Sequence, residues 1–194
     1  NINFSAIDMC GTGGDSKGTF NISTAASFIV SASGVKVAKH GNRSMTSRSG
    51  SADVLESLGI NITLSPDKVA KQIKEIGIGF MFAPNLHPAM KHAMCARQEL
   101  GIRTVFNLLG PLCNPANVKR QAMGIFDGNL TEKIARVLKK LGTEEAYIFH
   151  GEDGLDEITI SNHTILTHLD INGKIKTIKI HPTDYGFIKC DINE

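Results

Sequence analysis

Short apolar runs alternate with amphipathic segments along most of the chain. Strands are predicted where a few mainly apolar residues stand between polar or turn-forming ones, at 35–38, 78–83, 121–126 and 146–150. Helices are predicted where apolar residues recur every three or four positions, at 22–33, 52–58, 66–76, 87–100 and 131–141. This alternation favours an α/β fold with a central, largely parallel sheet flanked by helices, in which ligands bind beyond the strand ends.

Capping and termination signals support the helix predictions. Ser65-Pro66 is typical of a helix start, because serine caps the first turn and proline is tolerated at its first position. Glycines at 34, 59 and 77 follow predicted helices, where helices commonly end. The apolar stripes expected to face the core are Ile22, Ala25, Ala26, Ile29 and Ala32 in the first helix, Ala52, Leu55 and Leu58 in the second, and Val69, Ile73 and Ile76 in the third.

Two segments depart from the regular alternation. The segment 103–115 is apolar but is interrupted by residues such as Asn107 and Pro111, and it predicts a strand or a helical turn that runs into a rigid loop. Residues 157–180 alternate polar and apolar side chains, and Asn172-Gly173 between two such runs is a hairpin signal. We therefore expect one mixed sheet with an antiparallel hairpin region toward the C-terminus.

The composition narrows the class of protein. With 194 residues, 41% hydrophobic and 21% charged, the chain is long enough for one domain with a sizeable core and fits no disordered class. The formal charge of +2 argues against a nucleic-acid or membrane partner, so any basic site has to be local. Because the four cysteines include no Cys-x-x-Cys pair, we expect reduced thiols, a cytoplasmic location and no zinc site. Neither a signal peptide nor a membrane span is expected.

A glycine-rich stretch at 11–14 precedes the first predicted helix. Three glycines in four residues let the backbone adopt positive φ and bring its N–H groups close to a ligand, and the helix N-terminus behind them favours an anion. The stretch matches neither of two common phosphate-binding motifs. It is not a P-loop, because Lys17 is followed by Gly18 rather than serine or threonine, and its glycine spacing does not complete the dinucleotide fingerprint. The stretch predicts a phosphate-binding loop. The alternative is a glycine-rich connection to a capped helix.

Charged residues follow two other predicted strands. Lys39, His40 and Arg43 are predicted to lie in a polar loop. The guanidinium of Arg43 would make a bidentate contact with a phosphate, and the ammonium group of Lys39 would add a positive charge beside it. The alternative is a solvated surface loop. Asp156 and Glu157 are adjacent carboxylates that repel one another, and a hard divalent ion such as Mg²⁺ relieves the repulsion while bridging to substrate phosphates. The alternative for this pair is an acidic turn.

Seven motifs stand out in chain order. They are Gly11-Thr12-Gly13-Gly14-Asp15, Asn21-Ile22-Ser23-Thr24, Lys39-His40-Gly41-Asn42-Arg43-Ser44, Gly50-Ser51-Ala52-Asp53-Val54-Leu55, Phe106-Asn107-Leu108-Leu109-Gly110-Pro111-Leu112, Asn114-Pro115-Ala116 and Asp153-Gly154-Leu155-Asp156-Glu157. Together they resemble the motifs of the anthranilate phosphoribosyltransferase family, in the same order and over nearly the whole chain. Coincidence in one motif is easy, but coincidence in seven is not.

The resemblance implies transfer of the phosphoribosyl group from phosphoribosyl pyrophosphate to the amine of anthranilate, with pyrophosphate leaving and Mg²⁺ required. The residues that it implies for phosphoribosyl pyrophosphate are Gly11, Thr12, Gly13, Gly14, Asp15, Thr19, Asn21, Ser23, Thr24, Lys39, Asn42 and Ser51. Those that it implies for anthranilate are Gly11, His40, Asn42, His87, Arg97, Gly110 and Pro111, with Arg97 facing the carboxylate. Those that it implies for Mg²⁺ are Ser23, Asp156 and Glu157.

The reaction implied by the resemblance needs mainly positioning and electrostatic stabilisation of the leaving group, with no covalent intermediate. His40 is the candidate for a general base. The family also has a small N-terminal helical domain and final helices, so we expect residues 1–194 to form an incomplete catalytic α/β domain. The full-length protein is expected to be a homodimer.

Two other functions stay open at this point. A pyrimidine nucleoside phosphorylase-like enzyme resembles this fold, but it has no metal-bound pyrophosphate for the acidic pair to hold. A non-enzymatic, nucleic-acid-binding relative would need a basic stripe, which a charge of +2 with scattered lysines does not supply.

Overall fold

The structure is a computed structural model that describes residues 2, 4–15, 17–44, 49–87, 99 and 104–191. The strands are β1 (Ile7–Gly11), β2 (Val37–Gly41), β3 (Ile78–Phe82), β4 (Arg120–Gly124), β5 (Glu145–Gly151), β6 (Thr164–Leu169) and β7 (Ile175–Ile180). The α-helices are α1 (Ile22–Ala32), α2 (Ser51–Ser57), α3 (Pro66–Ile76), α4 (Ala83–Leu86), α6 (Phe106–Leu112) and α7 (Thr131–Lys140). The short 3₁₀ helices are η2 (Gly128–Leu130) and η3 (Pro182–Tyr185).

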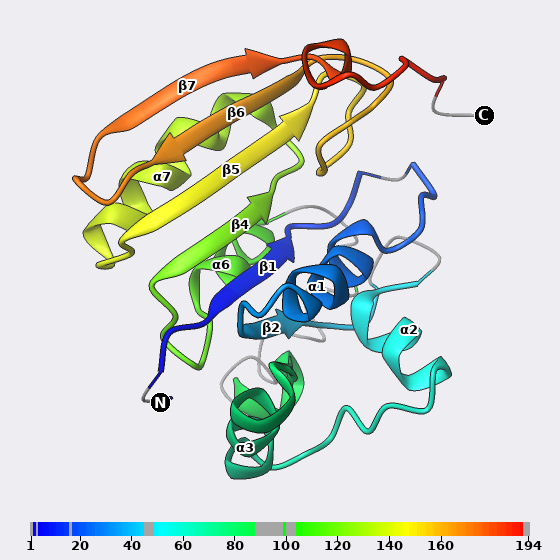
Figure 1. Ribbon diagram of the computed structural model, residues 1–194, viewed down its shortest axis with the longest axis vertical. Helices are drawn as coiled ribbons and strands as arrows, with labels where there is room; N and C mark the ends of the chain where they lie inside the picture. The colour runs from blue at the N-terminus through cyan, green and yellow to red at the C-terminus, as the bar shows by residue number, and fades with distance from the viewer. Residues whose placement is uncertain are drawn as a thin grey trace.

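The strands form a mixed sheet in the order β3-β2-β1-β4-β5-β6-β7 (Figure 1). The first five strands in this order are parallel, and β6 and β7 are antiparallel additions joined at the predicted Asn172-Gly173 hairpin. From β1 the chain adds β2 and β3 on one side and β4 and β5 on the other. Open α/β sheets bind ligands at such a reversal, outside the carboxyl ends of the strands. The predicted fold class is therefore confirmed.

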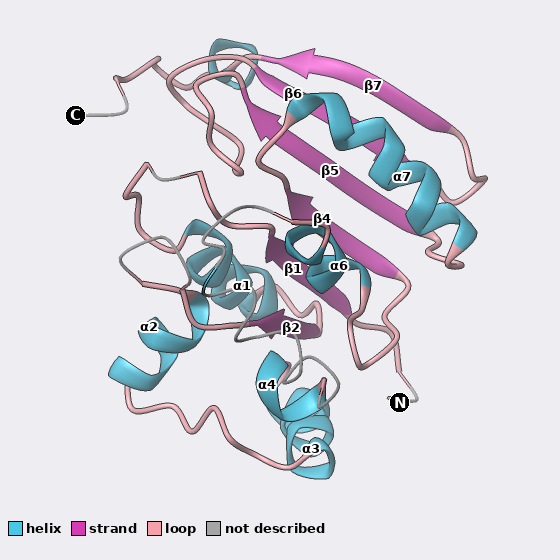
Figure 2. Ribbon diagram, turned by 180° about the vertical axis from the view of Figure 1, so that it is seen from behind, coloured by secondary structure: helices cyan, strands magenta, loops and turns pink. Residues whose placement is uncertain are grey.

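Helices cover both faces of the sheet. α1 lies over β1 and β2 on one face (Figure 1), whereas α6 and α7 lie on the opposite face (Figure 2). One core cluster joins α7 to β4, β5 and β6 and includes Met123, Ile134, Leu138, Ile148 and Leu169. A second joins α3 to β2 and β3 and includes Ala38, Val69, Ile73 and Met81. The first cluster also includes Cys10, near the C-terminal end of β1, where the glycine-rich stretch begins.

The prediction for the buried face of the first helix is wrong. In α1 the buried residues are Thr24 and Ser27, whereas Ile29 is 72% exposed and Ala25 is exposed as well. The Ser27 hydroxyl donates to the Ser23 carbonyl oxygen at 2.6 Å, so its polar group is satisfied within the helix. The small side chains let the helix pack close to β1 and β2. Because these buried residues are polar, the spacing of apolar residues along the helix does not reveal this face.

The other predicted stripes are confirmed except at their last positions. In α2 and α3 the predicted residues Ala52, Leu55, Val69 and Ile73 are buried. Leu58 follows α2 and Ile76 ends α3, and both are about two-thirds exposed, at 65% and 64%. Helix ends tilt away from the surface they pack on, and the last residue of an apolar stripe is the first to leave it.

Two predictions of local structure need correction. β1 was not predicted, because the sequence from Asp8 onward was assigned to the glycine-rich loop. Lys39 and His40, which were predicted to lie in a polar loop, lie inside β2 and are 3% and 6% exposed, so the alternative of a solvated surface loop is wrong for them as well. For the segment 103–115, where a strand or a helical turn was predicted, the structure has the helix α6, so the helical alternative is confirmed. The predicted helix 87–100 lies mostly outside the described residues, and within the described part of the chain no helix is long and apolar enough to span a membrane.

Candidate active site

A cavity of about 350 Å³ lies at the C-terminal ends of the parallel strands. The predicted site residues that line it are Gly11, Thr12, Gly13, Gly14, Asp15, Thr19, Asn21, Ser23, Lys39, His40, Asn42, Ser51, His87, Gly110, Pro111, Asp156 and Glu157. Thr24 does not line it: this residue is buried, and its hydroxyl has no hydrogen-bond partner among the residues described. Arg97 lies outside the described residues. The volume is in the range of small-molecule sites.

The glycine-rich loop after β1 is fixed against β4. The Thr12 N–H donates to the Gly124 carbonyl oxygen at 3.0 Å, which continues the pairing of the two strands past their ends. Gly13 and Gly14 have φ values of 65° and 81°, a conformation that side chains with a Cβ rarely adopt. The Gly13 N–H then points at the Asp156 carboxylate, with N to Oδ2 at 2.7 Å. The Gly13 N–H is therefore donated to a carboxylate of the protein itself, and phosphate binding by this loop stays a prediction.

The acidic pair lies beside both the loop and the start of α1. Glu157 Oε1 accepts a hydrogen bond from the Ser23 N–H at 3.3 Å, as Asp156 does from Gly13. Burial raises the pKa of Asp156 to about 6, and the nearby charge of Asp15 adds to the effect. Burial and the charge of Asp156 raise the pKa of Glu157 to about 8. The charge of Lys39 opposes the rise at Glu157 but does not cancel it, so the two buried carboxylates together favour an additional cation.

The donor set at this point fits Mg²⁺. Hard oxygen ligands are available from the two carboxylates and from the Ser23 hydroxyl, which also accepts a hydrogen bond from Lys39 Nζ at 3.1 Å. Among the described residues, no group of three or more His, Cys, Asp or Glu side chains is arranged to hold a metal. Mg²⁺ usually takes one or two protein carboxylates and completes its shell with water and substrate phosphates.

Glu157 is expected to make stability depend on pH. Its pKa is about 8 in the folded chain against 4.5 when unperturbed, so between these values the folded state holds the proton more tightly. The free energy of unfolding therefore falls as the pH rises through this window. Between pH 5 and pH 8, we expect the free energy of unfolding of Glu157→Gln, which does not titrate, to fall by about 3 kcal/mol less than that of the unaltered chain. Urea unfolding of both proteins in metal-free buffer measures the difference, and equal losses would contradict the assignment.

Lys39 supplies the buried positive charge of the cavity. Its Nζ donates to the Met9 carbonyl oxygen at 2.5 Å and to the Ser23 hydroxyl. Burial lowers the pKa of Lys39, while the charges of Asp8, Cys10 and Glu157 oppose the effect. Its position in the middle of β2 brings it next to Ser23 and Glu157, and its contact with phosphate stays a prediction.

Asp8 supports this arrangement, although its role was not predicted. It is fully buried in β1, and its Oδ1 accepts a hydrogen bond from the His40 N–H at 3.0 Å, while Oδ2 faces Gln121 Nε2 at 3.4 Å. Burial raises its pKa, and hydrogen bonds and the charge of Lys39 oppose the rise. Asp8 thereby ties the end of β2 to β1 beneath the cavity. A carboxylate among apolar residues just before a glycine-rich loop was the sequence signal for it.

Gly124 allows the acidic loop to reach the cavity. A Cβ added at Gly124 would lie 1.7 Å from the Asp156 carbonyl oxygen, a contact that the backbone can relieve only by moving. We expect Gly124→Ala to displace Asp156 and to weaken Mg²⁺-dependent ligand binding by about tenfold or more. Titration calorimetry of the folded variant measures the effect. Unchanged binding would mean that the acidic loop does not depend on its packing against β4.

His40 and His87 form a pair on the other side of the cavity. Their Nε2 atoms are 3.2 Å apart and the rings pack edge to face with centroids at 5.0 Å, so one imidazole donates to the other. Burial lowers the pKa of His40 to about 4, and His87 and Lys39 add to the effect, although a hydrogen bond with the Gly110 backbone opposes it. His40 is therefore neutral at pH 7. Such a weakly basic imidazole is suited to orient a hydrogen-bonding group rather than to remove a proton from it.

The wall next to this pair is partly apolar and was only partly predicted. Phe106, Leu109 and Cys113 line the cavity from α6 and its C-terminal end, in addition to the predicted Gly110 and Pro111. The Pro111 carbonyl oxygen accepts a hydrogen bond from Gln121 Nε2 at 2.6 Å, which anchors α6 to β4. A flat aromatic ligand fits a wall of this chemistry. Phe106, Leu109 and Cys113 lie within a few residues of Gly110-Pro111 in the sequence, and this proximity was the signal that could have identified them.

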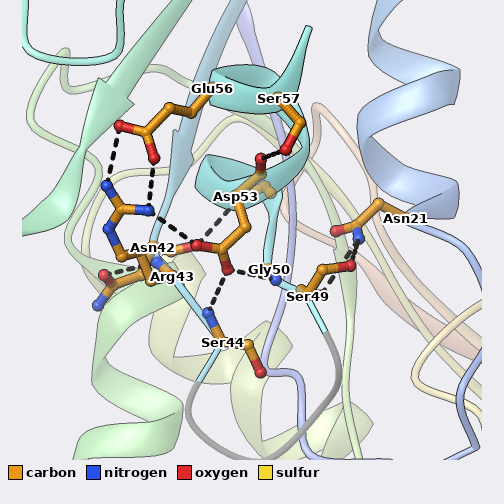
Figure 3. A network of polar contacts seen from close by, with 10 residues as sticks. Asn21, Asn42, Arg43, Ser44, Ser49, Gly50, Asp53, Glu56 and Ser57 are labelled. Atoms are coloured by element: carbon orange, nitrogen blue, oxygen red, sulfur yellow. Dashed lines mark hydrogen bonds and ion pairs between the residues drawn. The ribbon is translucent and has the colours of Figure 1, made fainter.

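Arg43 does not present its guanidinium as a free phosphate ligand. It donates to Asp53 Oδ1 at 2.9 Å and, through both terminal nitrogens, to Glu56 at 2.8 and 3.0 Å (Figure 3). The second oxygen of Asp53 accepts the N–H groups of Ser44 and Gly50 at 3.0 and 2.8 Å. The pairing joins the end of β2 to α2 and holds the cavity residues Ser49 to Ser51 in place. The sequence did not indicate this role for Asp53.

Comparison with known proteins agrees with this geometry. The chain is 57% identical over 188 residues to anthranilate phosphoribosyltransferase of Petrotoga mobilis, covering 97% of this chain and 54% of that protein. The corresponding protein of Persephonella marina is 50% identical, with 97% and 55% covered. The chain thus spans about half the length of the curated relatives it matches.

Solved structures match over the whole described architecture. Anthranilate phosphoribosyltransferase from Thermus thermophilus superposes with a TM-score of 0.89 at 41% identity, covering 99% of this chain and 56% of that one. The enzyme from Saccharomyces cerevisiae in complex with PRPP and Mg superposes with a TM-score of 0.89 at 33% identity, covering 100% and 53%.

A family model matches nearly the entire sequence. It is described as the a/b domain of a glycosyl transferase family, and it matches residues 3–194. The sheet order, the cavity at the strand ends and the relatives all agree with this match. The chain therefore belongs to this glycosyl transferase family and carries its α/β domain.

Proposed function

We propose that the protein containing this chain is an anthranilate phosphoribosyltransferase, which transfers the phosphoribosyl group of phosphoribosyl pyrophosphate to the amine of anthranilate. The observation that carries the proposal is that the glycine-rich loop, Lys39 and the acidic pair meet in one cavity. The names of the relatives and the PRPP and Mg bound to the yeast enzyme support it. In this proposal residues 1–194 are the catalytic α/β domain. The proposal includes a homodimer for the full-length protein, which rests on the family resemblance alone.

The pyrophosphate of the donor is proposed to bind against the glycine-rich loop and the N-terminus of α1. Backbone N–H groups and the dipole of a helix N-terminus together bind phosphate well. Asp156, Glu157 and Ser23 would hold Mg²⁺, which would neutralise part of the negative charge of the pyrophosphate. Lys39 contributes a fixed positive charge that does not need to reorganise as pyrophosphate leaves.

Anthranilate is proposed to bind on the side of the histidine pair and α6. The apolar wall formed with Phe106 and Leu109 fits its ring, and neutral His40 can accept or donate a hydrogen bond that orients its amine. The lone pair of the amine attacks C1 of the ribose as the C–O bond to pyrophosphate breaks, and the proton that the nitrogen then loses passes to water or to the departing pyrophosphate. The residues of this chain act by orientation and by stabilising the leaving group, and no side chain has to form a covalent bond.

The test is an assay of pyrophosphate release by the full-length protein. We expect release to require phosphoribosyl pyrophosphate, anthranilate and Mg²⁺ together. Phosphorolysis of thymidine by inorganic phosphate, without pyrophosphate release, would contradict the proposal and favour a nucleoside phosphorylase. Tight and steeply salt-dependent binding of single-stranded DNA, with no release, would favour the nucleic-acid-binding alternative.

A further inference from the structure

The acidic pair is carried by a loop whose two arms cross-link to each other. The loop connects β5 to β6 and passes through Gly151, Asp156 and Glu157 before returning at Thr164. Near its base, the Gly151 N–H donates to the Leu155 carbonyl oxygen at 2.9 Å, and the Glu152 N–H donates to the His163 carbonyl oxygen at 2.8 Å. Leu155, next to the acidic pair, is 4% exposed and anchors the outgoing arm in the protein interior.

Asp153 joins the two arms through its carboxylate. Oδ2 accepts hydrogen bonds from the hydroxyl groups of Thr159 and Ser161, which lie on the returning arm. Oδ1 accepts the Leu155 N–H at 3.2 Å on the outgoing arm. Burial raises the pKa of Asp153, but the hydrogen bonds from Ser161, Thr159 and Leu155 outweigh it and leave the pKa lowered. The carboxylate is therefore charged at neutral pH and accepts from both arms at once.

The local backbone is adapted to this contact. A Cβ at Gly151 would lie 2.5 Å from Asp153 Oδ1 and close to Thr159, so only glycine leaves room for the carboxylate. Thr159 is 4% exposed, and its hydroxyl oxygen also accepts the Ser161 N–H at 3.0 Å. The cluster of Asp153, Thr159 and Ser161 is thus a built polar contact and not a chance surface pairing.

Asp153 faces away from the candidate active site. It does not line the cavity that holds the glycine-rich loop, and together with Ser161 it borders a separate hollow next to Lys189 and Cys190. Its carboxylate therefore acts on the cavity only through the loop. The loop in turn sets the distance from Asp156 to the Gly13 N–H, which is 2.7 Å.

We propose that Asp153 is a positioning residue, which cross-links the two arms of the β5–β6 loop and thereby sets the placement of the Asp156 and Glu157 carboxylates for metal binding. The metal part of this inference rests on the proposed function, whereas the placement of Asp156 against Gly13 does not. Outer-shell partners that orient metal ligands typically change metal affinity by about 10- to 100-fold when they are removed.

The experiment compares Asp153→Ala and Asp153→Asn with a matched control, Asp170→Asn. Asp170 accepts the N–H groups of Asn172 and Lys174 at 2.9 and 2.8 Å, and so fixes the β6–β7 turn of the same sheet far from the cavity. Two quantities are measured on each folded protein: the Mn²⁺ concentration at half saturation, by electron paramagnetic resonance, and the hydrogen-exchange rate of the Gly13 amide, by NMR.

We expect Asp153→Ala to raise the Mn²⁺ midpoint and to speed exchange of the Gly13 amide, each by about tenfold. For Asp153→Asn, the Mn²⁺ midpoint and the Gly13 exchange rate should lie between those of Asp153→Ala and of the unaltered chain, because the amide keeps one of the two acceptor oxygens. Asp170→Asn keeps the Oδ1 acceptor of its turn and should change neither quantity. If Asp153→Ala does not fold, Ser161→Ala, which removes a single donor, should show a smaller change of both quantities in the same direction.

Two results would overturn the inference. One is a Gly13 exchange rate in the Asp153 variants equal to that of the unaltered chain. The other is faster exchange with an unchanged Mn²⁺ midpoint, because the acidic pair would then bind metal without its cross-link. Failure of the unaltered chain to bind Mn²⁺ would instead count against the metal site of the proposed function, and the Gly13 exchange rate would still decide whether Asp153 positions the loop.

Discussion

Replacing Asp156 with asparagine and Glu157 with glutamine is expected to weaken Mg²⁺-dependent binding of phosphoribosyl pyrophosphate by about 100-fold or more. The two substitutions keep the size and shape of the side chains but remove both negative charges, which are the main ligands in reach of a cation in the cavity. Because the charges that burial penalises are gone, the folded protein should be as stable as the unaltered chain at neutral pH, or more so. Titration calorimetry with and without Mg²⁺ measures the effect.

The matched control for this double variant is a second pair of adjacent carboxylates. Glu144 and Glu145 lie at the start of β5, at the opposite end of the strand, and both pair with Arg120. Glu144→Gln with Glu145→Gln removes the same charge from the protein but none from the cavity. It should leave donor binding unchanged. Retention of metal-dependent binding by the Asp156 and Glu157 double variant would reject the assignment of this pair.

Lys39→Met is expected to lower the affinity for phosphoribosyl pyrophosphate by about 10- to 100-fold. Methionine fills a similar volume without charge, so the loss corresponds to about 1.5–3 kcal/mol for a hydrogen bond to a charged group. Lys36→Met is the control, because Lys36 precedes the same strand but does not line the cavity. Equal affinities for the Lys39 variant and the unaltered chain, measured by calorimetry with Mg²⁺ present, would remove Lys39 from the donor site.

Much of the fold could be predicted because its signals are local. Turn residues at Asn172-Gly173, the cap at Ser65-Pro66 and the apolar runs of β3 and β4 each identify their element within a few residues. The inner face of α1 could not be predicted, because Thr24 and Ser27 face the sheet as small polar residues while Ile29 is exposed. Hydrophobic spacing indicates a buried face only where apolar side chains form the contact.

The sequence indicated which residues form the candidate site, but it did not indicate most of the contacts between them. The glycine-rich loop and the acidic pair were recognisable as motifs, and the family resemblance indicated that they act together. The contact between Gly13 and Asp156 joins residues 143 positions apart, so no local pattern indicates it. The same holds for Asp8, whose carboxylate supports β2 from inside the sheet, and for Arg43, whose guanidinium pairs with the carboxylates of Asp53 and Glu56.

Binding of phosphoribosyl pyrophosphate to the 194-residue chain, titrated calorimetrically once with Mg²⁺ and once with EDTA, tests the central claim most directly. The claim is that the glycine-rich loop, Lys39 and the acidic pair form a metal-dependent site for the donor. The expected result is saturable binding of one donor molecule with Mg²⁺ and at least about a tenfold loss of affinity in EDTA. Binding of equal strength in both buffers, or none in either by the folded chain, would contradict it.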